Sequence, residues 1–224
     1  MKVSDALMTR QSVRAFLPTP VPEKTVRAII ETAARAPSGG NLQPWNVHVV
    51  AGAERDRFLN IIREKMKTTP MGEGSEYHIY PPDLKEPYRT RRFRVGEAMY
   101  ATLNIAREDK MKRLEIFAKN FAFFDAPVAM FFLIDRIMQQ GQWADLGMFM
   151  QSIMLMAREH GLHTCAQEAW GIWPRTVKEF LGVNDDYIMF AGMGLGYIDN
   201  KNPINSLRTE RAPLAEYATF RGFA

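Results

Sequence analysis

Basic and small polar residues gather near both ends of the 224-residue chain. The group near the N-terminus is the run Arg10-Gln11-Ser12-Val13-Arg14, and the group near the C-terminus contains Arg208 and Arg211. A single arginine is most often a solvated surface charge. Several guanidinium groups beside a hydroxyl group, however, are well suited to a doubly anionic phosphate. The sequence therefore predicts a phosphate site if these two distant segments converge in the fold.

A glycine pattern, Gly192-x-Gly194-x-Gly196, could be mistaken for a nucleotide-binding loop. Such a loop requires a strand-to-helix turn whose helix N-terminus meets the phosphates. Here the glycines lie inside an apolar strand pattern and lead into polar residues 199–203. We therefore reject a dinucleotide fingerprint and expect the glycines to permit the close approach of another backbone or a flat ligand.

The remaining reactive side chains form no recognisable catalytic or metal-binding pattern. Cys165 is the single cysteine, and its apolar strand context predicts an inert core thiol. His160 and His163 flank an expected helix end, where surface or capping roles are expected. Because the four histidines and the thiol have no zinc-like spacing, we expect no metal site.

Composition indicates one globular domain, since 46% of the residues are hydrophobic and 24% are charged. No charge-free stretch approaches the roughly 18–20 apolar residues that a membrane helix needs. The N-terminus lacks the apolar run of a secretory signal. We therefore expect a protein that does not cross a membrane and that stays in the cytoplasm.

The positive charge of the chain is concentrated in one segment. Residues 85–119 hold ten Lys/Arg and five Asp/Glu, so the net charge of this segment is +5. The net charge of the whole chain is +4, so the remaining residues sum to −1. Basic and acidic residues alternate there, and no nucleic-acid recognition motif accompanies them, so we expect no nucleic-acid partner. A solvated helical face is the favoured interpretation, and attraction of an anionic substrate is a secondary one.

Apolar periodicity predicts a sheet covered by helices. Residues 68–87 have no sustained period and are predicted to form a long excursion over the surface. Helical spacing or helix start and stop signals predict helices at residues 22–36, 54–66, 88–121 (two helices that break near 108–109), 145–160 and 174–181. Short apolar or β-branched runs predict strands at residues 46–51, 127–134, 162–166 and 187–197.

Two signatures occur in order near the N-terminus: RQSVRAF at residues 10–16 and AARAPSGGNLQPW at residues 33–45. In this order and spacing they resemble the opening motifs of the FMN-dependent nitroreductase family. The resemblance covers nearly the whole chain, because further matching segments follow at residues 123–128, 142–147, 161–170 and 205–213.

The resemblance implies an α+β, nitroreductase-like fold, with a central mixed, mostly antiparallel sheet flanked by helices. It implies a single nitroreductase-like domain over residues 1–224, in which the excursion and helices at about 68–121 form the variable part. Because the family site lies at a subunit interface, an intertwined homodimer with a large apolar interface is also implied.

The resemblance also implies roles for individual residues. Arg10 and Ser12 correspond to family residues at the phosphate or ribityl chain of FMN, and Arg14 to one near the pyrimidine edge of the ring. In the family, the loop after residue 36 packs on the flavin from the partner subunit, and the stretch after residue 166 offers backbone N–H groups to flavin N5. The implied cofactor-binding residues are Arg10, Gln11, Ser12, Arg14, Pro37, Ser38, Gly39, Asn41, Gln167, Glu168, Ala169 (where many members have glycine), Arg208 and Arg211.

The implied activity is that of an FMN-dependent NAD(P)H oxidoreductase that reduces nitroaromatic compounds, or related acceptors such as quinones, by ping-pong hydride transfer. Flavin N5 carries the chemistry, so no catalytic side chain is implied. The basic segment 85–119 suggests a preference for carboxylated nitroaromatics. The alternatives are other reactions on this fold (reductive dehalogenation, enoate reduction or flavin destruction) and a non-catalytic flavin-binding protein.

Overall fold

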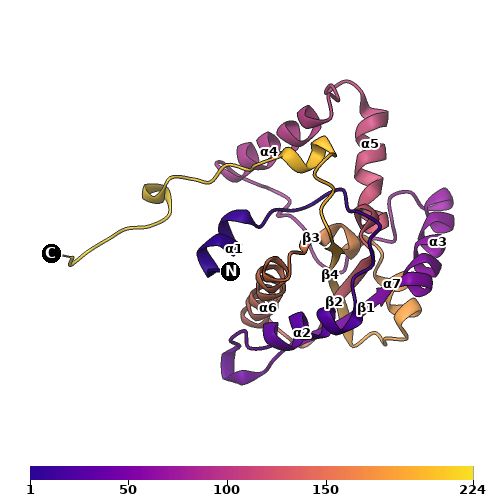
Figure 1. Ribbon diagram of the computed structural model, residues 1–224, viewed down its shortest axis with the longest axis horizontal. Helices are drawn as coiled ribbons and strands as arrows, with labels where there is room; N and C mark the ends of the chain where they lie inside the picture. Colours follow the sequence, from indigo (N-terminus) through magenta and orange to yellow (C-terminus); the bar gives the residue numbers. More distant parts are fainter. Residues whose placement is uncertain (224) are drawn as a thin grey trace.

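A four-stranded antiparallel sheet lies at the centre of the protein, and the computed structural model describes residues 1–223 around it (Figure 1). The strands are β1 (Trp45–Ala51), β2 (Val128–Asp135), β3 (His163–Gln167) and β4 (Tyr187–Gly196), in the spatial order β1-β2-β4-β3. Each pair of neighbouring strands is antiparallel, so the strand pairing itself is not mixed. Its one parallel element is an isolated bridge between Ser12 and Thr164.

Strand β2 is apolar from Val128 to Ile134 because helices cover both faces of the sheet. Its alternate residues enter two different cores, with Phe131 and Leu133 on one side and Met130 and Phe132 on the other. All four side chains are fully buried. The continuous hydrophobic run in the sequence thus reflects burial on both faces, since successive strand side chains point in opposite directions.

Each face of the sheet has its own helices. On one face, α2 (Glu23–Ala33) and α6 (Gln140–Glu159) supply apolar side chains to the core. On the other face, α3 (Gly52–Thr68) and α7 (Pro174–Leu181) do the same. The short helix α1 (Val3–Thr9) contacts α6. The predicted helices and strands on both faces are confirmed, with bounds that differ by a few residues.

The largest differences from the predicted elements lie at helix ends and starts. The first of the two helices predicted within 88–121 ends at Thr102, six residues before the predicted break near 108–109. Helix α6 begins at Gln140 rather than near Asp145, because Gln139 and Gln142 cap its first turn reciprocally. Helix α1 was not predicted, since only Ala6 of its seven residues is buried and no apolar stripe marks it. The C-termini of α6 and α7 were easier to predict: Gly161 and Gly182 follow these helices with φ of 72° and 67°.

The variable part leaves the body as α4 (Tyr88–Thr102) and α5 (Lys110–Ala118), as Figure 1 shows. The apolar stripe predicted in the second of these helices is present but has no cover within the chain. Met111, Leu114 and Phe117 are 69%, 56% and 45% exposed. Helix α5 therefore presents an apolar face to the surroundings.

The glycines of β4 permit close approach, as predicted, and the groups that approach belong to the protein itself. A Cβ atom added to Gly192 would lie 2.3 Å from Cδ1 of Trp170. One added to Gly196 would lie 2.5 Å from Cδ of Pro127. Side chains of this chain, rather than a flat ligand, occupy the space next to these glycines.

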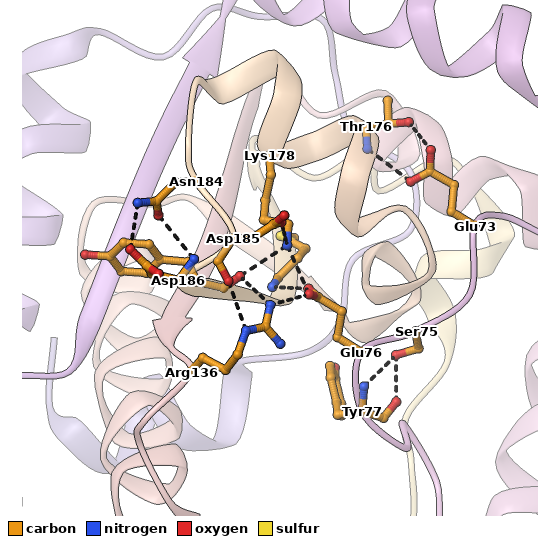
Figure 2. Close-up of polar contacts among 12 residues, drawn as sticks. Glu73, Ser75, Glu76, Tyr77, Arg136, Thr176, Lys178, Asn184, Asp185 and Asp186 are labelled. Carbon is orange, nitrogen blue, oxygen red and sulfur yellow. Dashed lines mark hydrogen bonds and ion pairs between the residues drawn. The ribbon is translucent and has the colours of Figure 1, made fainter.

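The excursion at residues 68–87 is fixed to the body by the carboxylate of Glu76 (Figure 2). This carboxylate accepts hydrogen bonds from Arg136 Nη2 at 2.7 Å, Lys178 Nζ at 3.0 Å and the backbone N–H of Met189 at 3.1 Å. Although desolvation opposes it, the hydrogen bonds from Arg136 and Lys178 hold the pKa of Glu76 below its usual value. The excursion is thereby held across α7 and β4.

A second carboxylate of the excursion binds the N-terminal turn of α7. Glu73 accepts hydrogen bonds from the backbone N–H and the hydroxyl group of Thr176, at 3.0 and 2.6 Å (Figure 2). A negative charge at a helix N-terminus is favourable because unpaired N–H groups point towards it. Together with Glu76, this contact fixes the chain before it enters α4.

We predict that Lys178→Ala destabilises the protein by about 3 kcal/mol, because the Lys178 side chain is buried and its loss removes a buried ion-pair partner of Glu76. The matched control is Asp185→Ala, which removes the other partner of Lys178. The Asp185 side chain is 93% exposed, so its loss should cost less than about 1 kcal/mol. Urea unfolding measures both values, and equal losses would contradict the assigned role of the buried pair.

Candidate functional site

The predicted phosphate-binding segment at residues 10–14 lies along β3. The backbone N–H of Val13 donates to the carbonyl oxygen of Thr164 at 3.0 Å, and Ser12 forms the parallel bridge to Thr164. The Val13 side chain is fully buried, whereas Arg10, Ser12 and Arg14 are half-buried. Burial of Val13 therefore anchors the segment and leaves its polar neighbours at the surface of the sheet edge.

The buried side chain of Asn205 joins this segment to the tail of the chain. Its Oδ1 accepts from the backbone N–H of Arg14 at 2.8 Å, and its Nδ2 donates to the carbonyl oxygen of Ala15 at 2.8 Å. The backbone carbonyl of Asn205 accepts from Gln11 Nε2 at 3.1 Å and from Arg208 Nη1 at 3.2 Å. The two distant basic segments therefore converge, as the phosphate-site hypothesis requires.

Sequence reasoning missed Asn205. It follows Pro203 within an aperiodic tail, where an asparagine is usually a turn residue. In the structure it lies in the short 3₁₀ helix η4 (Pro203–Ser206) and is almost fully buried. Its partners lie about 190 residues away in the sequence, so no local pattern could have indicated its role.

The converging arginines carry positive charge that the protein does not neutralise. Within residues 1–223, no carboxylate forms an ion pair with Arg10, Arg14, Arg208 or Arg211. Desolvation, and then the nearby charge of Arg211, lower the pKa of Arg10. The guanidinium groups of Arg10 and Arg211 repel each other, and no carboxylate neutralises them. A bound anion would therefore stabilise this arrangement.

Several buried polar atoms in the same region also lack partners. Gln11 Oε1, Thr164 Oγ1 and Gln167 Oε1 accept no hydrogen bond from the described residues. A buried polar atom without a partner is destabilising, and a bound ligand can supply the missing hydrogen bond. The site therefore fits an elongated ligand that carries both a phosphate and polar groups, as FMN does.

The predicted residues that follow β3 lie at its other end. Gln167 is buried and donates from Nε2 to the carbonyl oxygen of Asn120 at 2.8 Å. Glu168 and Ala169 begin the 3₁₀ helix η3 (Glu168–Ile172), and desolvation raises the pKa of the Glu168 carboxyl although the side chain still reaches solvent. At about 3.4 Å per strand residue, roughly 10 Å separate Thr164 from Gln167. The strand thus places the two ends of the candidate site apart.

The loop with Pro37, Ser38, Gly39 and Asn41 does not join this cluster within one chain. The backbone N–H of Gly39 donates to the carboxylate of Asp145, near the start of α6, at 3.1 Å. The α6 residue that lies near β3 is Arg158, thirteen positions further along the helix. A helix rises about 1.5 Å per residue, so roughly 20 Å separate the two ends.

Two side chains near the cluster illustrate what burial does to reactive groups. His163 is half-buried, and its Nδ1 lies 3.4 Å from Arg158 Nη1. Because His163 is the first residue of β3 and is half-buried, the expected surface or capping role is wrong for this residue. Burial, together with Arg158 and Arg208, lowers the pKa of His163 to about 4. Cys165 is buried and its pKa is raised to about 11 by burial, which confirms an inert thiol.

Within residues 1–223, no group of three or more His, Cys, Asp or Glu side chains is arranged to hold a metal ion. Among the helices of this part of the chain, none is both long and apolar enough to cross a membrane.

The fold and the site define a class: an α+β protein in which an uncompensated arginine cluster lies at one end of an edge strand. Comparison with known proteins gives this class a name. A model of the nitroreductase family matches residues 7–197. The chain therefore belongs to the nitroreductase family.

Individual relatives match over almost their full length. The chain is 37% identical over 218 residues to a 4-nitrobenzoate reductase from Pseudomonas putida, covering 96% of this chain and 93% of the relative. It is 36% identical over 222 residues to a nitrobenzene nitroreductase from Ectopseudomonas oleovorans, covering 97% and 96%. The crystal structure of the FMN and NADPH-dependent nitroreductase NfnB from Sphigopyxis sp. strain HMH matches with a TM-score of 0.96 and 44% identity, over 100% of both chains.

Proposed function

We propose that the protein is an FMN-dependent NAD(P)H oxidoreductase that reduces nitroaromatic compounds or related acceptors such as quinones. The observation that carries this proposal is the convergence of residues 10–14 and the tail through Asn205, with arginines that have no carboxylate partner, beside a strand whose far end presents residues 167–169. The relatives support it, because they are named as reductases of nitrobenzoate and nitrobenzene. A cytoplasmic location, where reduced nicotinamide cofactors are regenerated, agrees with this activity.

The residues of this chain would hold FMN in an extended orientation along β3. Arg10, Ser12, Arg208 and Arg211 would bind the phosphate, with Gln11 beside them. Arg14 would lie near the ring, where a fixed cation favours negative charge on a neighbouring group.

At the other end of β3, residues 167–169 would orient the ring through backbone N–H groups. FMN held there would supply two-electron hydride-transfer chemistry between NADPH or NADH and the acceptor. Because the nicotinamide and the acceptor would occupy the same space in turn, ping-pong kinetics are expected.

The proposed assembly is an intertwined homodimer, and the C-terminal arm (residues 214–223) supports it. The arm extends away from the body (yellow in Figure 1) and carries exposed apolar side chains, among them Tyr217 at 70% and Phe223 at 81% exposure. Exposed apolar side chains in such an arm are typical of a segment that packs on another chain. We propose that each arm docks on a second copy of the chain.

The groove that would receive the arm lies between α2 and the edge strand β1. Its volume is about 540 Å³, and Val26, Ile30, Val47 and Val49 contribute to its apolar lining. The outer edge of β1 has no neighbouring strand among the described residues, so its backbone groups are free to pair with an added segment. A dimer would also allow Pro37, Ser38, Gly39 and Asn41 to complete the site of the partner subunit.

We expect the purified protein to carry FMN, and anaerobic addition of NADPH or NADH to bleach the flavin absorbance. Addition of 4-nitrobenzoate, nitrobenzene or a quinone should then restore the oxidised spectrum. If no flavin is bound, and none binds when FMN is supplied, the enzyme proposal is wrong and a non-catalytic role is favoured. Reduction by a nucleotide without reoxidation by any of these acceptors would favour another reaction on the same fold.

Arg211→Ala should weaken FMN binding by about 2 kcal/mol, or roughly thirtyfold, because it removes one charged hydrogen-bond donor from the phosphate. Fluorescence titration of the apoprotein with FMN measures the Kd. The matched control is Arg63→Ala on α3, where Arg63 donates only to Asn60 and lies outside the site. An unchanged Kd for Arg211→Ala would remove this residue from the phosphate site.

The double substitution Tyr217→Ser and Phe220→Ser should shift the protein from dimer to monomer, because it removes two apolar anchors of the arm. Sedimentation velocity measures the state, and flavin content should fall with the dimer. Met71→Ser is the control, since Met71 is 83% exposed but lies outside the arm. A double variant that remains fully dimeric would contradict arm docking.

A further inference from the structure

A cavity of about 430 Å³ lies between α4 and the tail of the chain. One face of α4 forms one wall, since Thr90, Arg91, Arg94 and Ala98 recur at helical spacing. Residues 207–213 form the other wall and include Arg208 and Arg211. The cavity therefore adjoins the arginine cluster but draws part of its lining from the variable segment.

The arginines in this part of α4 differ in whether their side chains already contact another group of the protein. Arg89 pairs with Glu86, and Arg91 pairs with Glu216 at 2.5 Å. The guanidinium group of Arg92 lies 3.9 Å from the ring centroid of Tyr80. Arg94 has neither an ion pair nor a hydrogen bond with residues 1–223, and it lines the cavity opposite Arg208 and Arg211. It is the helix cation that remains available to a ligand.

We propose that the α4 side of this cavity, next to the flavin phosphate that Arg208 and Arg211 would bind, is a second anion subsite that takes the adenosine 2′-phosphate of NADPH, with Arg94 as the residue that selects NADPH over NADH. The proposal rests on the proposed function, because NADPH must be a substrate. A planar, permanently charged guanidinium group suits a phosphate, which presents several oxygens to its fork. NADH lacks this phosphate and would leave Arg94 without a partner.

The position of the cavity favours the nicotinamide cofactor over the electron acceptor as the source of the anion. The cavity lies beside the phosphate end of the candidate site, and roughly 10 Å of β3 separate Thr164 at that end from Gln167, where the ring-orienting residues 167–169 begin. A small carboxylated nitroaromatic over the ring would not reach so far. The adenosine end of an extended dinucleotide would reach the cavity.

The test compares Arg94→Gln with the wild-type holoenzyme. The ratio of the KM for NADPH to the KM for NADH should rise about tenfold, as expected for the loss of one charge-assisted hydrogen bond. The Kd of adenosine 2′,5′-bisphosphate, measured by calorimetry on the oxidised holoenzyme, should rise by a similar factor. Arg94→Lys should retain part of the preference, because it keeps the charge but not the fork.

The matched control is Arg89→Gln, which removes a cation of the same helix that does not line the cavity. It should change neither the KM ratio nor the affinity for the bisphosphate. A KM ratio that is unchanged in Arg94→Gln would overturn the proposal.

Two other outcomes would reassign the cavity and also overturn the proposal. Loss of bound FMN from Arg94→Gln would show that the cavity serves the flavin phosphate. A selective rise in the KM for 4-nitrobenzoate over that for nitrobenzene would show that it serves an aryl carboxylate. Failure of the proposed function would be seen separately in the wild-type protein, because neither NADPH nor NADH would reduce its flavin. That result would overturn both proposals.

Discussion

The buried amide of Asn205 is the interaction on which the candidate site depends. Its oxygen accepts from the backbone of Arg14, and its nitrogen donates to the carbonyl oxygens of Ala15 and Asp199. A buried amide without partners is costly, so this set of bonds strongly restricts where the tail can lie against residues 10–15. Arg208 and Arg211 reach the N-terminal arginines only because the tail is held there.

The sheet supplies the frame for that contact. Strand β3 pairs with β4 over its whole length, and residues 12 and 13 then add to β3 through Thr164. Burial of β2 on both faces fixes the register of the ladder, because a shift of one residue would exchange its two cores. The site is therefore built on the edge of the buried central sheet.

The variable segment is attached to this frame at defined points. Glu73 and Glu76 hold the excursion on α7 and β4 before the chain enters α4. Helix α4 then forms one wall of the cavity beside the arginine cluster. The same segment leaves an apolar face on α5, and the C-terminal arm is likewise uncovered, so the single chain leaves apolar surface for a partner.

The sequence by itself determined the local elements and the chemical type of the site. The double-sided strand β2, the glycine-ended helices α6 and α7, and the two arginine groups could all be recognised, because each depends on neighbours close in the chain. Tertiary structure alone decided the role of Asn205, the partial burial of His163 and the separation of the Ser38 loop from the arginine cluster. These depend on contacts between residues far apart in sequence, and no local period records which distant segments will meet.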